Sequence, residues 1–178
     1  MSDKYTPVRM IGKGSFGSVY LVCENLTQKQ YVMKRISTHG VPDKELEGYQ
    51  QEVRLLSELE HPGIVSLRES FIDDEQHLCI VMDYCEGGDL TAYFKARKSR
   101  LTEAEIIFHF IQMCLSLSYM HDKNILHRDL KTQNIFLRDG LIQLGDFGIS
   151  KVLGGSRDFA QTCIGTYNTC IYKLLLRK

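Results

Sequence analysis

The chain has 178 residues with 22 Lys or Arg and 22 Asp or Glu, so its formal net charge is zero. This length suits one domain or two small lobes that share a cleft, and the balanced charge gives no reason to expect nucleic acid or an anionic membrane as a main partner. Residues 1–4 lack an apolar signal core, and the apolar stretch 106–117 is too short and too polar to span a bilayer. The scattered cysteines form no C-x-x-C pair, which argues against zinc and for a reducing setting.

Residues 5–36 predict three short strands, and a glycine pattern lies between the first two. The glycines are Gly12, Gly14 and Gly17, and residues 18–22, which follow them, are rich in β-formers. In a dinucleotide-binding fold such glycines open a helix, whereas here a strand follows. The pattern therefore favours a glycine-rich hairpin over the phosphates of a nucleotide, where missing side chains let the backbone come close. An ordinary glycine hairpin is the alternative.

Lys34 ends the third strand, where a solvated edge charge is one interpretation. Residues 43–59 carry apolar side chains at close to helical spacing, and Pro62 follows as a stop signal. Glu52 lies in the middle of this predicted helix, beside the apolar stripe, and is the best candidate partner for Lys34. Three other acidic residues of the helix are expected to be solvated: Glu45, Glu47 and Glu58.

Two further strands are predicted at 64–72 and 77–83, with a polar turn at 73–75 between them. Gly87 and Gly88 then mark a flexible connector. Asp89 follows the connector, where it suits the N-cap of a short helix and could also bind a ribose.

A long helix is predicted to begin after Thr102, which forms a capping box with Glu105. Its wide apolar stripe predicts a core-facing side made of Ile106, Ile107, Phe110, Ile111, Cys114, Leu117 and Met120. His109 and His121 are given no catalytic role. Farther along, 135–137 and 141–144 predict a hairpin that presents two polar loops side by side.

The first polar loop, residues 127–134, reads H-R-D-L-x-x-x-N and contains Asp129, Lys131 and Asn134. The second, residues 146–148, reads D-F-G and begins with Asp146. Both patterns are typical of sites of phosphoryl transfer. Phosphoryl transfer requires positioning, metal ions and charge neutralisation rather than covalent work by the protein. Asp129 would accept the proton of an attacking hydroxyl, and Lys131 could neutralise charge on the moving phosphoryl group. Asn134 and Asp146 offer oxygen ligands suited to Mg²⁺. A polar loop between two hairpin strands is the alternative interpretation.

Together these motifs resemble, from about residue 5 to Thr166, the catalytic domain of eukaryotic protein kinases. Lys131, two residues after Asp129, is similar to serine/threonine rather than tyrosine kinases, and four segments resemble the NIMA-related kinases: 84–90, 131–137, 144–149 and 163–166. The resemblance implies an α+β, two-lobed fold with a five-stranded small lobe carrying one helix, and a partial helical large lobe. The implied divisions are an N-terminal tail at 1–4, the small lobe at 5–82, a hinge at 83–88, the partial large lobe at 89–166 and a divergent tail at 167–178.

The resemblance also implies ATP and Mg²⁺ as cofactors and transfer of the γ-phosphate to serine or threonine of a protein substrate. Lys34 would contact the α- and β-phosphates and pair with Glu52. Met82 would be the gatekeeper, and Val19 and Phe136 would sandwich the adenine. The implied nucleotide-binding set is Ile11, Gly12, Gly14, Gly17, Val19, Val32, Lys34, Met82, Asp83, Cys85, Asp89 and Phe136.

Thr162 occupies the position that the family typically phosphorylates, and Arg128 would receive the phosphate. A solvated loop threonine is the alternative. The family also implies a cytoplasmic location, with the centrosome, cilium or nucleus as finer sites.

After Thr166 the resemblance stops, and no A-P-E motif follows. This departure predicts a chain truncated after the activation segment, without the later helices of the large lobe. The long helix would then lose a packing partner, and its apolar face, with Phe110 and Ile111 among the candidates, is expected to be partly exposed. Two interpretations therefore stay open: an ATP-dependent kinase, and a catalytically weak fragment that binds nucleotide or partners. Weak catalysis is expected because displacing a catalytic group by about 1 Å can cost roughly a hundredfold in rate.

Overall fold

A computed structural model describes residues 3–14, 17–146 and 151–152, without the side chains of residues 14, 43–45, 52 and 151–152. The chain divides into two compact units. The first contains residues 1–58 and 66–84, and the second contains residues 59–65 and 85–178.

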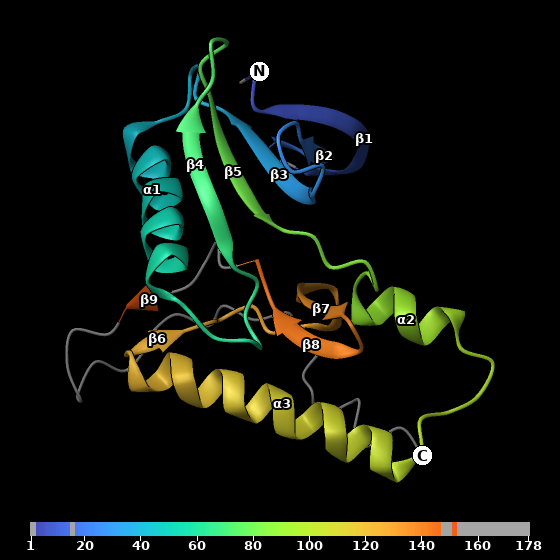
Figure 1. The fold of residues 1–178 in the computed structure, drawn as a ribbon. Coiled ribbons are helices and arrows are strands. Elements are labelled where there is room, and N and C mark those ends of the chain that lie inside the picture. The colour runs from blue at the N-terminus through green and yellow to red at the C-terminus, as the bar shows by residue number, and fades with distance from the viewer. Residues whose placement is uncertain (1–2, 15–16, 147–150, 153–178) are drawn as a thin grey trace. The chain divides into compact units, whose positions relative to one another are not determined.

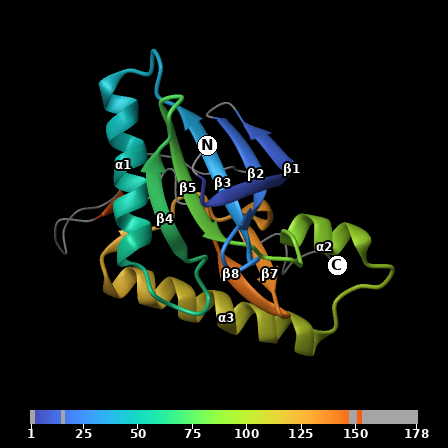
Figure 2. The same cartoon turned by 45° about the horizontal axis from the view of Figure 1, so that its top comes forward.

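The first unit is built on a five-stranded antiparallel sheet in the order β1-β2-β3-β5-β4, with α1 along its β4 side (Figures 1 and 2). The strands are β1 (Tyr5–Gly14), β2 (Gly17–Glu24), β3 (Gln30–Ser37), β4 (Leu67–Ile72) and β5 (His77–Asp83), and α1 is Asp43–Glu58. This architecture confirms the predicted small lobe of five strands and one helix.

The predicted start of the fourth strand at residue 64 was wrong, because β4 begins at Leu67. Ile64 and Val65 belong to the second unit instead. Ile64 forms a parallel bridge with Leu144, and the Val65 N–H donates to the Leu144 carbonyl at 2.8 Å. The apolar run at 64–65 is thus buried by a partner distant in sequence, which periodicity alone does not reveal.

One face of the sheet forms a core of buried side chains from four strands: Tyr5, Val22, Tyr31, Met33, Cys79 and Val81. In β3, the buried residues Tyr31 and Met33 alternate with the half-buried residues Val32 and Lys34. Because successive side chains of a strand point to opposite faces, Val32 and Lys34 lie on the other side of the sheet from this core.

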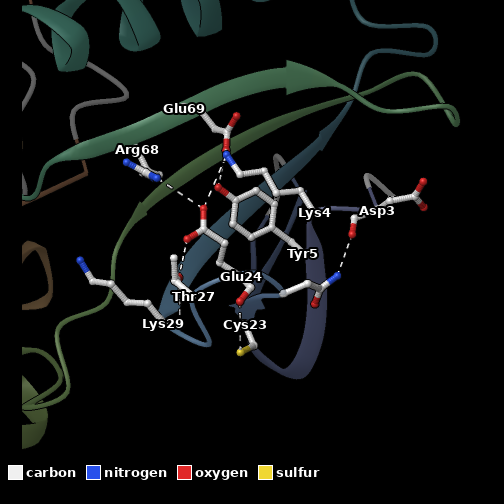
Figure 3. A network of polar contacts seen from close by, with 10 residues as sticks. Asp3, Lys4, Tyr5, Cys23, Glu24, Thr27, Lys29, Arg68 and Glu69 are labelled. Carbon is white, nitrogen blue, oxygen red and sulfur yellow. Dashed lines mark hydrogen bonds and ion pairs between the residues drawn. The ribbon is translucent and has the colours of Figure 1, made fainter.

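A network of charged groups joins β1, β2 and β4 (Figure 3). Glu24 is only 2% exposed, and its carboxylate lies 3.6 Å from Lys4 Nζ and 3.4 Å from an Arg68 guanidinium nitrogen. Lys4 also contacts Glu69 at 2.5 Å, and the Tyr5 hydroxyl donates to the same carboxylate. Burial, together with the Glu69 carboxylate, raises the pKa of Tyr5 to about 12. The cations compensate for burying Glu24, which would otherwise be costly.

The predicted turn between β4 and β5 is confirmed and is organised by Asp73. Its buried carboxylate accepts hydrogen bonds from the backbone N–H groups of Glu75 and His77 at 3.0 and 2.9 Å, and from Arg35 Nε at 2.8 Å. Burial alone would raise the pKa of Asp73, but the His77 N–H and the Arg35 guanidinium outweigh it and lower the pKa to about 2. The ionised carboxylate therefore stabilises the turn.

The second unit contains α2 (Leu90–Ala96), α3 (Glu103–Asp122), β6 (Ile125–Leu126), the 3-10 turn η1 (Thr132–Asn134), β7 (Ile135–Arg138), β8 (Leu141–Leu144) and β9 (Lys151–Val152). The predicted capping box is confirmed, because Thr102 and Glu105 exchange side-chain and backbone hydrogen bonds at the start of α3. The predicted β7–β8 hairpin is also confirmed. Asp139 and Gly140 at its tip both have positive φ, of 50° and 77°, as a tight type I′ turn requires.

The predicted core face of α3 was wrong for Ile107, whereas the expected partial exposure of Phe110 and Ile111 is confirmed. Ile107, Phe110 and Ile111 are 48%, 40% and 51% exposed, whereas Met113 and Met120 are buried. The reason is that β6 and β8 pack against another side of the helix (Figure 1). In the part of the chain that the structure describes, no helix has the length and apolar character needed to cross a bilayer.

Candidate active site

The first unit gathers four predicted nucleotide-binding residues on one face of its sheet. Val19 pairs with Lys34 across β2 and β3, and Val32 pairs with Met82 across β3 and β5. Directly opposed residues share a face of a sheet, as do residues two apart along a strand. Val19, Val32, Lys34 and Met82 therefore form a half-buried apolar surface that carries one lysine.

The glycine-rich hairpin has the predicted form, with a strand rather than a helix after the glycines. Gly12 pairs with Val19, and Gly14 pairs with Gly17. A Cβ atom on Gly17 would lie 2.1 Å from the Arg35 carbonyl oxygen, so glycine is required where β2 approaches β3. A Cβ atom on Gly12 would meet Val19 at an ordinary 3.6 Å. Ile11 lies at a register shift of β1 and is 37% exposed.

The predicted pair of Lys34 and Glu52 stays a prediction. Lys34 is half-buried in β3, and Glu52 lies in α1, but the side chain of Glu52 lies outside the described residues. Asp83, at the end of β5, is half-buried and forms an ion pair with Lys29 at 3.7 Å.

The predicted flexible connector at Gly87 and Gly88 is hydrogen-bonded to β7 within the second unit. The Gly87 N–H donates to the Leu137 carbonyl, and the Leu137 N–H donates to the Gly88 carbonyl, each at 2.9 Å. A Cβ atom on Gly87 would lie 2.7 Å from Leu137 Cβ, so this glycine permits a close approach. Asp89 then forms a bridge with Phe136, which brings two predicted nucleotide-binding residues together.

The thiol of Cys85 is buried in the same region. Its Sγ donates to Gln143 Oε1 at 3.2 Å, and Gln143 Nε2 donates to the Pro62 carbonyl at 3.1 Å. The role of Gln143 was not predicted from the sequence, because its partners lie 58 and 81 residues away.

Asp129 lies at the centre of the polar loop that precedes β7. Lys131 Nζ contacts Asp129 Oδ2 at 2.6 Å, and Asn134 Nδ2 donates to the same oxygen at 2.9 Å. Within the described residues, both side-chain contacts of Asp129 go to Oδ2, so Oδ1 is the oxygen that can accept a proton. The carboxylate is thus oriented by two neighbours for which the sequence suggested other roles, charge neutralisation for Lys131 and metal binding for Asn134.

His127 connects this loop to the segment after β8. Its imidazole is 3% exposed, and Nδ1 accepts the Asp129 N–H at 3.3 Å. The other ring nitrogen, Nε2, therefore carries the proton and donates to the Gly145 carbonyl at 3.0 Å. Burial lowers the pKa of His127, which keeps the ring neutral. This bridging role was not predicted from the sequence.

Asp146 is held next to Asn134 through Gly145. The Gly145 N–H donates to the Asn134 carbonyl at 3.0 Å, and Asp146 follows with a positive φ of 58°. A Cβ atom on Gly145 would lie 2.9 Å from the Phe136 ring, so the chain passes closely over that side chain. The two predicted metal ligands are therefore near neighbours.

The donor set fits Mg²⁺. Because Asn134 Nδ2 donates to Asp129, the remaining side-chain atom of Asn134 is a carbonyl oxygen, and Asp146 supplies a carboxylate. Among the described residues, no cluster of three or more His, Cys, Asp or Glu could hold a metal ion. Two oxygen donors suit Mg²⁺, which usually keeps several waters and binds substrate phosphates in addition. Thr162 and its predicted phosphorylation lie outside the described residues.

Thr132 is a further buried residue of the loop that the sequence did not single out. Its hydroxyl oxygen lies 2.7 Å from that of Thr91 on α2. The two residues are 41 positions apart, so no local pattern joins them.

Comparison with known proteins gives matches along most of the chain. A family model described as protein kinase domain matches residues 5–170. Serine/threonine-protein kinase Nek1 of Mus musculus is 48% identical over 166 residues, which are 92% of this chain and 14% of that protein. Nek4 of Mus musculus is 44% identical over 164 residues, covering 91% of this chain and 21% of Nek4. Nek5 of Homo sapiens is 44% identical over 167 residues, covering 92% of this chain and 23% of Nek5. The chain thus spans less than a quarter of each of these relatives.

Proposed function

Because the chain belongs to the protein kinase domain family, we propose that it carries the activity of an ATP-dependent serine/threonine protein kinase of the NIMA-related type. The reaction transfers the γ-phosphate of ATP to a serine or threonine hydroxyl of a protein substrate. The observation that carries this proposal is the carboxylate of Asp129, oriented by Lys131 and Asn134 through contacts of 2.6 and 2.9 Å to a single oxygen.

Asp129 acts as the base in this proposal. Its Oδ1 accepts the proton of the attacking hydroxyl, while Oδ2 stays engaged with Lys131 and Asn134. Lys131 is only partly exposed, and its ammonium group also offsets negative charge that develops on the transferred phosphoryl group. Proton transfer by a positioned carboxylate typically accounts for roughly a hundredfold to ten-thousandfold in rate.

Asn134 and Asp146 would hold Mg²⁺, which supplies charge neutralisation at the ATP phosphates. His127 and Gly145 contribute by holding the backbone that carries these ligands, through the hydrogen bonds to Asp129 and Asn134. Because each hydrogen bond of this framework is buried or half-buried, the backbone that carries the ligands is held in place before ATP binds.

The first unit supplies the groups proposed to bind the nucleotide itself. Val19, Val32 and Met82 offer apolar side chains for the adenine on one face of the sheet, and Lys34 on that same face offers a cation for the phosphates. Gly12, in the hairpin beside Val19, leaves space for the phosphates to approach the backbone. The supporting observation is the strand register, which places these side chains on one surface.

Two finer proposals rest on the similarity to the Nek kinases. Phosphorylation of Thr162 would add about −1.5 to −2 charges, and Arg128 is the proposed partner. The proposed location is the cytoplasm, with the centrosome, cilium or nucleus as sites of action. Phosphosite mapping after incubation with an active Nek kinase tests the first proposal, and phosphate found only elsewhere would contradict it.

Binding of Mg-ATP is the first experimental test of the proposed function. At about a hundred times the dissociation constant, a ligand that binds only the folded state stabilises it by roughly 2.7 kcal/mol. We expect thermal unfolding to shift upward with Mg-ATP in the wild type and in the Lys95→Met control, and to shift little in Lys34→Met. No shift at millimolar Mg-ATP in a folded sample would contradict the proposal. Transfer of labelled phosphate then separates a kinase from a protein that only binds nucleotide.

A further inference from the structure

We propose that Thr91 is a positioning residue, whose hydroxyl holds the 3-10 turn η1 so that Asn134 is placed to bind Mg²⁺. The contact that carries this inference is the 2.7 Å separation between the hydroxyl oxygens of Thr91 and Thr132. Thr132 begins the turn, and Asn134 ends it. The inference rests on the proposed function, since it concerns the binding of Mg²⁺ together with ATP.

The α2 side of the contact is firmly anchored. The Asp89 carboxylate caps α2 by accepting the Ala92 N–H at 2.9 Å, and Asp89 also bridges to Phe136 on β7. Leu90, directly before Thr91, is 2% exposed. Thr91 therefore lies at a helix start that is fixed by the Asp89 cap, by the buried Leu90 side chain and by the bridge from Asp89 to β7.

The 3-10 turn η1, on the other side of the contact, has fewer stabilising interactions of its own. Lys131 precedes η1, and the structure shows no side-chain cap from Lys131 to the turn. Its ammonium group is instead engaged with Asp129. The backbone of the turn is closed by the Asn134 N–H, which donates to the Lys131 carbonyl at 2.9 Å. Because Thr132 is buried, its bond to Thr91 fixes the turn from inside the unit.

A shift of η1 would move Asn134 directly. The amide of Asn134 is held against Asp129, and its carbonyl oxygen is the proposed metal ligand, so a small rotation of the turn changes both contacts. Mg²⁺ tolerates little departure from its preferred geometry. We therefore expect loss of the hydroxyl pair to weaken the binding of ATP when Mg²⁺ is present. The affinity for ATP without Mg²⁺, which depends on the residues proposed in the sheet of the first unit, should not change.

Four variants test the inference: Thr91→Val, Thr132→Val, the double variant, and Thr91→Ser, which keeps the hydroxyl. Thr6→Val is the matched control, because Thr6 makes a hydroxyl contact of the same 2.7 Å length with Asn25 in the first unit. Calorimetry measures the affinity for ATP with Mg²⁺ and for ATP in a chelator. Removing one neutral hydrogen bond corresponds to a loss on the order of fivefold.

We expect Thr91→Val to lose about that factor in the presence of Mg²⁺ and nothing in the chelator, with affinity restored in Thr91→Ser. The double variant should be no worse than either single variant, since both single changes remove the same contact. Equal losses with and without Mg²⁺, strictly additive losses, or the same loss in Thr6→Val would overturn the inference.

A second measurement keeps the inference separate from the proposed function. Hydrogen exchange of the Asn134 amide in the absence of nucleotide should be faster in Thr91→Val than in the wild type, and unchanged in Thr91→Ser. If the wild type binds no ATP, the proposed function fails, and the exchange rates alone then decide whether Thr91 positions the turn. Equal exchange in all variants would contradict that role.

Discussion

His127 donates a hydrogen bond from Nε2 to the carbonyl oxygen of Gly145 at a distance of 3.0 Å. The other ring nitrogen accepts the Asp129 N–H, so one buried imidazole joins the loop of the proposed base to the segment of a proposed metal ligand. Replacing it by phenylalanine keeps a planar aromatic ring, although a larger one, but removes the partner of the half-buried Asp129 N–H and of the buried Gly145 carbonyl.

We expect His127→Phe to lower the free energy of unfolding by about 1–3 kcal/mol, the usual cost of unsatisfied buried polar groups. Urea denaturation measures this change. His121→Phe, at an exposed position near the end of α3, is the control and should change stability little. Equal effects of the two substitutions would show that the bridge does not stabilise the loop.

The same histidine predicts a pH dependence. Burial lowers the pKa of His127 below its ordinary value of 6.5, so the unfolded chain binds a proton there more readily than the folded chain does. Stability from His127 is therefore present above pH 6.5 and is lost as the pH falls below it. Unfolding measured from pH 7.5 to 5.5 should show this decline in the wild type and less of it in His127→Phe. Parallel curves for the two proteins would contradict the prediction.

Asp73 predicts a second loss of stability, at lower pH. Its pKa is about 2 in the folded protein against an ordinary 3.8, so its contribution is complete above pH 3.8 and is lost as the pH falls toward 2. The shift corresponds to about 2 kcal/mol. Acid denaturation should show that Asp73→Asn removes this component, whereas the exposed neighbour Asp74→Asn retains it. A midpoint shifted equally by both changes would count against the assignment to Asp73.

The glycine-rich hairpin predicts unequal effects of two alanine substitutions. Gly17→Ala would place Cβ 2.1 Å from the Arg35 carbonyl oxygen at a φ of 149°, so β2 and β3 must move apart, and we expect a loss of at least about 1–3 kcal/mol. Gly12→Ala meets only an ordinary contact at 3.6 Å, and should leave the unfolding temperature nearly unchanged while weakening ATP binding. Thermal unfolding compares the two variants. Similar stability of both would refute the packing argument.

Local patterns predicted the hairpins and caps of this chain, because each is encoded within a few residues. The capping box at Thr102 and the β7–β8 turn at Asp139 and Gly140 are confirmed examples. The family could also be predicted from the sequence, because its motifs lie at fixed spacing along the chain. The match to the protein kinase domain and to Nek1 confirms it.

Contacts distant in sequence could not be predicted in this way. The apolar run that begins at Ile64 was predicted to be part of a strand, because its partner, Leu144, lies 80 positions later and is not visible in the local pattern. The hydrogen bonds of Thr132 and Gln143 likewise join segments that are distant in sequence. The apolar stripe of α3 did not indicate which side the strands β6 and β8 would cover, although the partial exposure of Phe110 and Ile111 was expected and is confirmed.

Transfer of labelled γ-phosphate from Mg-ATP to a generic serine/threonine protein substrate tests the central claim most directly. The wild type should label serine or threonine, and Asp129→Asn should reduce the rate by roughly a hundredfold to ten-thousandfold, since it removes the proposed base. Asp122→Asn, at the exposed end of α3, is the matched control and should keep the wild-type rate. Absence of transfer by folded, Mg-ATP-bound wild type, or undiminished transfer by Asp129→Asn, would contradict the assignment of this chain as a protein kinase that uses Asp129.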